Sequence, residues 1–363
     1  MRAPRGAAVT AVDVQGAAAP PQPPSAVHPP PGKRPSSGVD STGGGHPPSA
    51  QRRGAPPAAP PEALRAALAA ADACAVAGEP LARHTSFRIG GPADLFVEVA
   101  SVPELQAILR ACHEHAYPVF FLGGGSNLLV SDRGVRGAVL KLGKPFDFVE
   151  WEPSVAESAL RVGAAVPFKR LVHQAVAAEL DGLQFGEGIP GTIGGGLMMN
   201  AGAFGGEIGR VVEALEVVAE DGEALLLPRA RLGFGYRRLE LPARAIITAV
   251  RLRLARGRTA ELTAAVADAR ARRERHQPRG YPNAGSIFKN PSGTHAGRLI
   301  EEVGLKGARL GNACFSEHHA NFIVNLGGAR AADVKALMDL ATRAVRQRLG
   351  VELEPEVRMV GEW

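Results

Sequence analysis

Two glycine clusters in the middle of the chain restrict its fold more than any other feature. The first, Gly123–Asn127, joins two strand-like runs, Val119–Leu122 and Leu128–Val130. The second, Gly186–Gly196, holds six glycines in eleven residues and is followed by the glycine-rich stretch Asn200–Gly206. A backbone without Cβ atoms can bend sharply, offer its N–H groups to an anion and press closely against a planar ring. The clusters are therefore either tight bends in a compact α+β domain or the walls of a cofactor site.

The spacing of these glycines excludes the common nucleotide-binding motifs. A doubly wound dinucleotide fold needs G-x-G-x-x-G at the start of a helix, whereas the first cluster leads from strand to strand. The chain also contains no G-x-x-x-x-G-K-[ST] phosphate loop, so nothing indicates nucleotide hydrolysis. A helix is predicted at about 166–180, between the clusters, and this arrangement favours a bound dinucleotide-like cofactor.

The composition is that of a protein with two or three hydrophobic cores. The chain has 363 residues, of which 45% are hydrophobic and 21% are charged. No stretch approaches the roughly 18 consecutive apolar residues of a membrane span. The N-terminal arginines are not followed by an apolar core with a cleavage site, so we predict no signal peptide. We expect a cytoplasmic protein with no membrane partner.

Most of the positive charge lies in the N-terminal part of the chain. Residues 1–61 carry +4 of the formal net charge of +6, and they are rich in proline and glycine. Such a composition predicts a disordered low-complexity tail. The remainder is nearly neutral, and its densest basic run, Arg270–Arg275, is predicted to be a solvated helix face. We therefore expect no nucleic-acid partner.

The three cysteines carry no recognisable motif. Cys74, Cys112 and Cys314 lie far apart and form no C-x-x-C arrangement. Disulfide pairing and a zinc site are both unexpected, and no metal is assigned. Cys112 is predicted to be a small buried hydrophobic residue.

Beyond Glu62 the pattern of apolar residues predicts mixed helices and strands. Ser101 and Glu104 form a capping box at the start of a helix, and Asp221-Gly222 is typical of a hairpin turn. Further elements are predicted by periodicity: helices over 62–72, 259–276, 295–303 and 331–349, and strands over 95–99, 246–254, 321–325 and 351–359. In the last of these strands Glu356 and Arg358 are two residues apart, so their side chains are expected on one face, as a surface ion pair or as half of an active site.

The run Asn283–Pro291 has the residues of a built site. Gly285 frees the backbone before Ser286, so that the hydroxyl can project from a sharp turn, while Phe288 is expected to anchor the next segment in a core. Lys289 and Asn290 supply a mobile charge and an amide, which suit a phosphate or carboxylate. Taken alone, the run is more typical of an ordinary polar turn that leads into a buried strand, and other segments of the chain favour the site.

Together these residues resemble the UDP-N-acetylenolpyruvoylglucosamine reductase family, the flavoenzymes of peptidoglycan precursor synthesis. The resemblance extends from about Leu81 to Met359 and rests on seven blocks in family order: His84–Gly91, Gly123–Asn127, Ile189–Gly191, Asn200–Ala203, Gly235–Arg237, Asn283–Pro291 and Leu353–Arg358. The fold it implies is α+β, with a two-lobed FAD-binding domain of the vanillyl-alcohol-oxidase type over 62–256, a lobe boundary near 144, and a smaller α+β substrate-binding domain over 257–363.

The resemblance implies an FAD-dependent reductase that uses NADPH to reduce a UDP-sugar enolpyruvyl ether. It makes Ser286 the proton donor, with Arg237 and Glu356 as catalytic companions, and a neutral alcohol suffices because the carbanionic centre is strongly basic. Arg237 can hold the substrate carboxylate and stabilise the charge that spreads into it. Glu356 is expected either to be protonated and donate a hydrogen bond to the substrate carboxylate, or to be ionised and orient Arg237. The remaining implied substrate contacts are Tyr236, Lys289, Asn290 and Arg358.

The flavin contacts are also implied by the resemblance. The FAD pyrophosphate is expected on the Gly123–Asn127 turn, which comprises Gly123, Gly124, Gly125, Ser126 and Asn127. The isoalloxazine ring is expected near a second set of residues: Gly188, Ile189, Pro190, Gly191, Thr192, Gly194, Asn200 and Ala201. FAD is expected to be bound tightly and without a covalent link. NADPH is expected to bind first and to leave before the enolpyruvyl substrate enters the same cleft.

The chain departs from the family pattern at a few positions. Phe204 stands where the family often has tyrosine, and Arg238-Leu239 replaces a usual serine two residues after Arg237. The short interval from Arg237 to Ser286 is similar to the subgroup that lacks an extra substrate-clamping loop. Two other hypotheses are an oxidase of the same cofactor fold, which the Ser286 and Glu356 blocks disfavour, and a non-catalytic binding protein, which would have no need of a proton donor.

Overall fold

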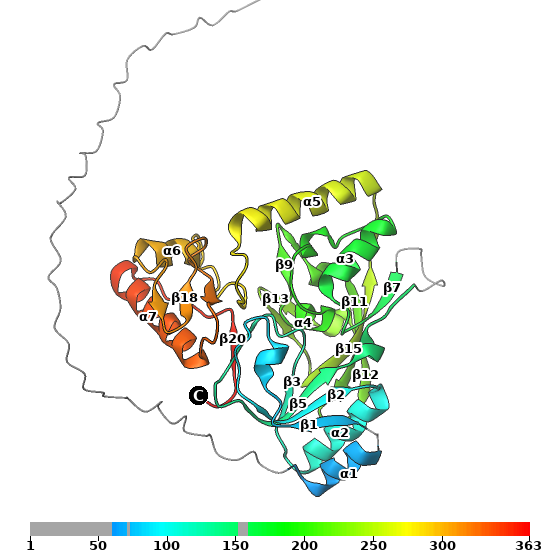
Figure 1. Ribbon diagram of the computed structural model, residues 1–363. Coiled ribbons are helices and arrows are strands. Elements are labelled where there is room, and N and C mark those ends of the chain that lie inside the picture. Colours follow the sequence, from blue (N-terminus) through cyan, green and yellow to red (C-terminus); the bar gives the residue numbers. More distant parts are fainter. Residues whose placement is uncertain (1–59, 71–72, 152–158) are drawn as a thin grey trace, which may run out of the picture. The chain divides into compact units, whose positions relative to one another are not determined.

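The computed structural model describes residues 60–70, 73–151 and 159–363, which belong to one compact unit (Figure 1). The predicted tail lies outside the described residues, apart from its last two positions. The helix predicted over 62–72 is found as α1 (Glu62–Ala70), and residues 71–72 again lie outside them. No helix among the described residues is long and apolar enough to cross a membrane.

The first lobe is a four-stranded sheet with two helices. Its strand order is β1 (Cys74–Ala77), β2 (Ala93–Val99), β5 (Val135–Leu142) and β3 (Val119–Phe121), and helices α1 and α2 (Val102–Glu114) contact each other. The predicted capping box is confirmed, because Ser101 Oγ accepts a hydrogen bond from Glu104 N at 3.2 Å and Glu104 Oε2 accepts one from Ala100 N at 2.6 Å. Strand β2 is buried on both faces, so its side chains do not alternate between buried and exposed as a half-buried strand would.

The second lobe is a five-stranded antiparallel sheet. Its strand order is β12 (Ala224–Pro228), β11 (Val212–Ala219), β15 (Ala245–Arg253), β7 (Ala159–Gly163) and β6 (Val149–Trp151). The predicted Asp221-Gly222 hairpin is confirmed as the turn between β11 and β12, where Gly222 has a φ of 85°. Helix α3 (Phe168–Ala177) precedes the second glycine cluster, and helix α4 (Ile193–Met198) contains its last three glycines.

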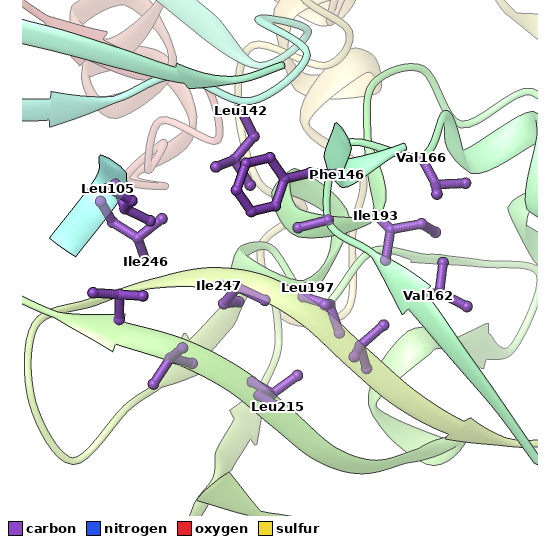
Figure 2. Packing of buried hydrophobic residues seen from close by; sticks show 14 of the residues in the cluster. Leu105, Leu142, Phe146, Val162, Val166, Ile193, Leu197, Leu215, Ile246 and Ile247 are labelled. Atoms are coloured by element: carbon purple, nitrogen blue, oxygen red, sulfur yellow. The ribbon is translucent and has the colours of Figure 1, made fainter. Parts of the chain in front are cut away.

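One hydrophobic core joins the two lobes. Leu105 and Leu142 of the first lobe belong to the same buried cluster as Val162 and Leu215 of the second (Figure 2). Helix α5 (Thr259–His276) has the predicted bounds and contacts α3 of the second lobe. Burial of a shared apolar surface favours a fixed arrangement of these elements.

The C-terminal part has a separate core. Its sheet has the order β17 (Arg309–Leu310), β18 (Ala313–Phe315) and β19 (Ile323–Asn325), and helices α6 (Ala296–Glu302) and α7 (Ala331–Leu349) pack with it. Phe288 is fully buried in this core, as predicted. Short paired strands complete the described fold: β8 (Leu180–Asp181), β9 (Gly202–Ala203), β10 (Gly206–Glu207), β13 (Gly233–Gly235), β14 (Arg238–Glu240) and β16 (Ala255–Arg256).

The end of the chain returns to the first glycine cluster. Strand β20 (Arg358–Val360) pairs in parallel with β4 (Leu128–Val130), which follows the Gly123–Asn127 turn. Glu356 and Arg358 line the same cavity, as their predicted common face implies, but the strand predicted over 351–359 is wrong in extent and Glu356 precedes it. The physical reason is that Glu356 N donates to Ile287 O at 2.8 Å, which draws the chain away from a regular ladder. The α+β fold class is confirmed.

Candidate active site

A cavity of about 1190 Å³ is lined by both glycine clusters and by the C-terminal part of the chain. Its volume exceeds the roughly 300–1,000 Å³ of a site for a drug-sized ligand, so it suits a larger molecule. Most of the predicted site residues line it: Gly123, Gly124, Gly125, Ser126, Asn127, Gly188, Ile189, Pro190, Thr192, Gly194, Ala201, Arg237, Ser286, Glu356 and Arg358. Five predicted residues are not in its lining: Gly191, Asn200, Tyr236, Lys289 and Asn290.

The glycine clusters pack directly against each other. A Cβ on Gly124 would lie 2.5 Å from Gly191 Cα, and one on Gly125 would lie 2.0 Å from His84 O. Gly125 also has a φ of 63°. Ser126 Oγ donates to Pro190 O at 3.1 Å, which ties the two loops together. The missing side chains therefore allow backbone to approach backbone, and this contact shapes the cavity wall.

Replacing Gly125 by alanine is expected to disrupt this wall. The positive φ alone costs about 1–3 kcal/mol for a residue with a Cβ, and the contact with His84 O adds a clash that backbone must relieve. Gly205→Ala is a matched control, because Gly205 has a φ of 83° but nothing lies within 4 Å of the place that its Cβ would take. The free energy of unfolding, measured with urea, and the flavin content should both be lower in Gly125→Ala than in Gly205→Ala. Equal losses in the two variants would contradict the packing argument.

Arg237 and Glu356 form an ion pair at the cavity. Arg237 Nε lies 2.7 Å from Glu356 Oε1, and Arg237 Nη1 donates to Gly202 O at 3.0 Å. Burial raises the pKa of Glu356 above its ordinary value, while the charges of Arg237 and Lys289 oppose that rise. The backbone of Arg237 has a φ of 57°, which is unusual for a residue with a long side chain. This geometry holds a guanidinium and a carboxylate at a fixed place in the cavity.

Ser286 is brought to the same cavity by a turn. Gly285 has a φ of 77°, and its N–H donates to Asn283 Oδ1 at 3.0 Å. Beyond Ser286, Ile287 O accepts the 2.8 Å hydrogen bond from Glu356 N. This bond connects the serine turn to the segment that carries Glu356. Three residues that are far apart in sequence, Arg237, Ser286 and Glu356, thus line one cavity.

Two predicted flavin contacts, Asn127 and Asn200, use their side-chain amides to form hydrogen bonds with the protein backbone. Asn127 Nδ2 donates to Glu356 O at 3.0 Å, and Asn127 O accepts from Arg358 N at 3.0 Å. Asn200 is buried, with Nδ2 donating to Gly235 O and Oδ1 accepting from Gly209 N, both at 3.1 Å. Both side chains therefore fix loops that surround the cavity.

The predicted substrate contacts are only partly gathered at the cavity. Arg358 lines it, whereas Tyr236 is 58% exposed and its ring lies 5.4 Å from the Arg237 guanidinium. Lys289 pairs with Glu354 at the surface. Asn290 Oδ1 accepts a hydrogen bond from Ala296 N at 3.1 Å, at the start of α6.

Sequence reasoning missed Arg273. The Arg270–Arg275 run was predicted to be solvated, but Arg270 and Arg273, three residues apart and so on one face of α5, both turn towards the second glycine cluster. Arg270 Nε donates to the buried Glu187 at 3.0 Å, and Arg273 lines the cavity. Arg270, Arg272 and Arg275 are exposed, and Arg272 pairs with Asp268 at 2.8 Å. The solvated-face prediction therefore holds for these three arginines and is wrong for Arg273, which is half-buried at the cavity because α5 packs against the lobe.

Asn321 was also missed, since one asparagine in an apolar run gives no signal. Its side chain is 3% exposed and forms two hydrogen bonds with the segment after Ser286: Oδ1 accepts from Phe288 N at 3.0 Å and Nδ2 donates to Phe288 O at 2.8 Å. Its backbone O accepts from Ile287 N at 2.8 Å. Asn321 thus fixes both residues that follow the serine.

Replacing Asn321 by alanine is expected to slow substrate reduction by more than the loss of folding stability accounts for. Buried backbone groups of Phe288 would lose their partners, at about 1–3 kcal/mol, and the serine turn would lose its anchor. Asn325→Ala is the matched control: Asn325 is also 3% exposed and bonds backbone groups of Phe87, Gly327 and Ala329. The free energy of unfolding in urea should fall by similar amounts in both variants, while the rate of substrate reduction should fall chiefly in Asn321→Ala. Equal rates would make Asn321 a purely structural residue.

Comparison with known proteins agrees with this geometry. The family model for an FAD binding domain matches residues 93–227, and the model for the C-terminal domain of UDP-N-acetylenolpyruvoylglucosamine reductase matches residues 277–360. UDP-N-acetylenolpyruvoylglucosamine reductase 2 of Symbiobacterium thermophilum is 50% identical over 284 residues, which cover 78% of this chain and 91% of that protein. This chain belongs to the UDP-N-acetylenolpyruvoylglucosamine reductase family.

Other members of the reductase family agree. The reductase of Caldanaerobacter subterraneus subsp. tengcongensis is 42% identical over 286 residues, covering 78% of this chain and 93% of that protein. The crystal structure of the reductase from Thermus caldophilus superposes with a TM-score of 0.68 at 39% identity, covering 79% of this chain and 98% of that one. The predicted family, the two-part α+β architecture and the FAD cofactor are thereby confirmed.

The cavity fits FAD on its own geometry. Residues of both glycine clusters line it, so backbone and small residues form much of its wall. Gly188 has a φ of 74°, which favours glycine, and a Cβ there would lie 2.6 Å from Arg273 Cδ. Among the described residues no group of three or more His, Cys, Asp and Glu side chains could hold a metal ion.

Proposed function

We propose that this chain reduces the enolpyruvyl ether of UDP-N-acetylglucosamine to UDP-N-acetylmuramate, a step of peptidoglycan precursor synthesis, with NADPH as the reductant. Membership of the reductase family supports the reaction, and the FAD binding domain supports the cofactor. The observation that carries the proposal is the meeting of Arg237, Ser286 and Glu356 at one cavity, which this reaction needs and an oxidase does not.

In this proposal Arg237 binds the substrate carboxylate. The guanidinium is permanently charged, and its planar fork matches a carboxylate or the enolate that forms from it. When bound, FAD supplies the hydride that it has taken from NADPH. Because hydride adds to the methylene carbon, negative charge develops on the neighbouring carbon and spreads into the carboxylate. Arg237, held by Glu356 at 2.7 Å, is already placed to stabilise that charge.

Ser286 supplies the proton that completes the reduction. Its hydroxyl donates to the carbon on which charge has developed, a new C–H bond forms, and the alkoxide is later reprotonated from solvent. The carbanionic centre is basic enough to take a proton from a neutral alcohol. Glu356, whose pKa is raised by burial, stands beside Arg237 and fixes its orientation. Arg358 at the cavity and Tyr236, Lys289 and Asn290 nearby are proposed to contact the remainder of the nucleotide sugar.

The division of the chain and its surroundings are part of the proposal. We place the FAD-binding domain over 62–256 with a lobe boundary near 144, and the substrate-binding domain over 257–363, with α5 packed on the former. The predicted partners are small molecules, the UDP-sugar enolpyruvyl ether and NADPH, and not nucleic acid or membrane. A cytoplasmic location agrees with the source of both substrates.

An anaerobic flavin experiment tests the function directly. The purified protein is reduced with NADPH, and UDP-N-acetylglucosamine enolpyruvate is then added while the flavin absorbance is followed. Prompt return of the oxidised spectrum together with the lactyl ether product is the expected result. A flavin that stays reduced until air enters would favour an oxidase, and a protein that binds no added FAD would refute the proposal.

A further inference from the structure

Arg273 is a half-buried cation that forms no ion pair with a described carboxylate. It lies on α5 and lines the cavity, and its Nε is buried without a hydrogen-bond partner. No described carboxylate forms an ion pair with its guanidinium, and the contact it does make is with the Phe204 ring at 5.6 Å. A buried nitrogen without a hydrogen-bond partner on a cation that faces a cavity indicates that a ligand completes the site.

The acidic groups near Arg273 are already engaged. Glu187 receives Arg270 Nε and Nη2, and it lies 3.0 Å from His173 Nε2. Glu356 is paired with Arg237. Burial, and then the charge of Arg237, lower the pKa of Arg273, although an arginine remains charged at neutral pH. This end of the cavity therefore carries more positive than negative charge and suits an anion.

We propose that Arg273 binds a planar oxyanion inside this cavity, as a contact additional to Arg237. The proposal rests on the proposed function, because that function brings two such groups into the site. One is the carboxylate of the enolpyruvyl group, and the other is the N1–C2–O2 edge of the flavin ring, which gains negative charge on reduction. The planar guanidinium fork matches either group. Arg273 lines the cavity beside Gly188, where a Cβ would lie 2.6 Å from Arg273 Cδ.

The test separates the two sources. Arg273→Met keeps most of the stem beside Gly188 and removes the charge, whereas Arg272→Met, at an exposed position on the same helix, is the matched control. The flavin midpoint potential is measured without substrate, and the affinity for UDP-N-acetylglucosamine enolpyruvate is measured on the oxidised holoprotein by flavin absorbance. FAD content and urea unfolding are recorded for each variant.

Each result has a defined meaning. If the flavin ring is the ligand, the potential falls by about 30–60 mV, which corresponds to a tenfold to hundredfold change for a two-electron couple. If the carboxylate is the ligand, substrate affinity falls roughly tenfold to hundredfold at an unchanged potential. Values within twofold of Arg272→Met in both measurements would overturn the proposal.

A second variant covers the case in which Arg273→Met retains no FAD. Arg273→Lys keeps the positive charge but loses the paired N–H donors, so it should shift the same quantity in the same direction. No change in either quantity for Arg273→Lys would also overturn the proposal, since the planar fork is part of it. The result stays distinct from a failure of the proposed function, which would already be seen as absent flavin re-oxidation in the unaltered protein.

Discussion

Replacing Ser286 by alanine should leave flavin reduction by NADPH nearly unchanged and slow reduction of the enolpyruvyl substrate by about 10²–10⁴-fold. This range is the usual contribution of a positioned proton donor. The asymmetry is expected because the hydroxyl acts only when the substrate carbon has gained charge. Stopped-flow absorbance of the two half-reactions, measured separately under anaerobic conditions, gives both rates.

Two further variants sharpen this prediction. Ser292→Ala changes an exposed serine a few residues further along the same loop and should leave both rates unchanged. Ser286→Cys should recover part of the lost rate, because a thiol can also donate a proton, but it should lose activity in air as the thiol is oxidised. Equal slowing of both half-reactions in Ser286→Ala would make the serine a structural residue of its turn.

The second large effect is expected at Arg237. Arg237→Met removes the charge that stabilises the developing enolate, and it should slow substrate reduction by about 10²–10³-fold, as for the loss of one oxyanion donor. Substrate affinity should fall as well, because the same group binds the carboxylate in the ground state. Arg238→Met is the matched control, since Arg238 is 68% exposed and pairs with Glu240 at 3.1 Å on the surface. The measurement is kcat/KM for the enolpyruvyl substrate, compared between Arg237→Met and Arg238→Met.

The same variant should also change the pH dependence of stability. Arg237 is the largest of the causes that lower the pKa of Glu356, so its removal leaves the burial effect opposed only by Lys289 and raises that pKa further. A carboxyl group with a raised pKa contributes stability that is full below its ordinary value of 4.5 and is lost as the pH rises through the folded-state value. Arg237→Met should therefore be destabilised relative to the unaltered protein more at pH 8 than at pH 5. Urea unfolding at both pH values measures this, and an equal loss would mean that Glu356 is not desolvated.

Much of the architecture follows from local sequence patterns. The helices at 259–276 and 331–349 have the predicted bounds, because both runs lack glycine and proline and are rich in residues that favour helices. The capping box at Ser101 and the Asp221-Gly222 hairpin are confirmed for the same reason. The reductase family could be predicted from the sequence because its short motifs occur in a fixed order, and comparison with known proteins confirms that prediction.

The errors arise where distant segments meet. The strand predicted over 351–359 is limited to Arg358–Val360, since Glu356 bonds to Ile287, a residue that no local pattern connects with it. The basic run on α5 is exposed as predicted except at Arg273, which lines the cavity, because periodicity shows which residues share a face but not what that face contacts. Lys289 and Asn290 looked like ligand contacts, but Lys289 pairs with Glu354 and Asn290 bonds the start of α6.

The sequence alone determined the residue types of this site and the family to which they belong. The site requires certain residue types: glycine at positive φ, serine after a turn, and the arginine and glutamate of their motifs. Each of these can be recognised within its own short segment of sequence. Only the tertiary structure decided that Arg237 lies 2.7 Å from Glu356, that Asn321 holds the segment after Ser286, and that Arg273 lacks a described partner. These facts depend on contacts between residues tens to hundreds of positions apart, and burial and charge at such contacts are set by packing and not by local propensity.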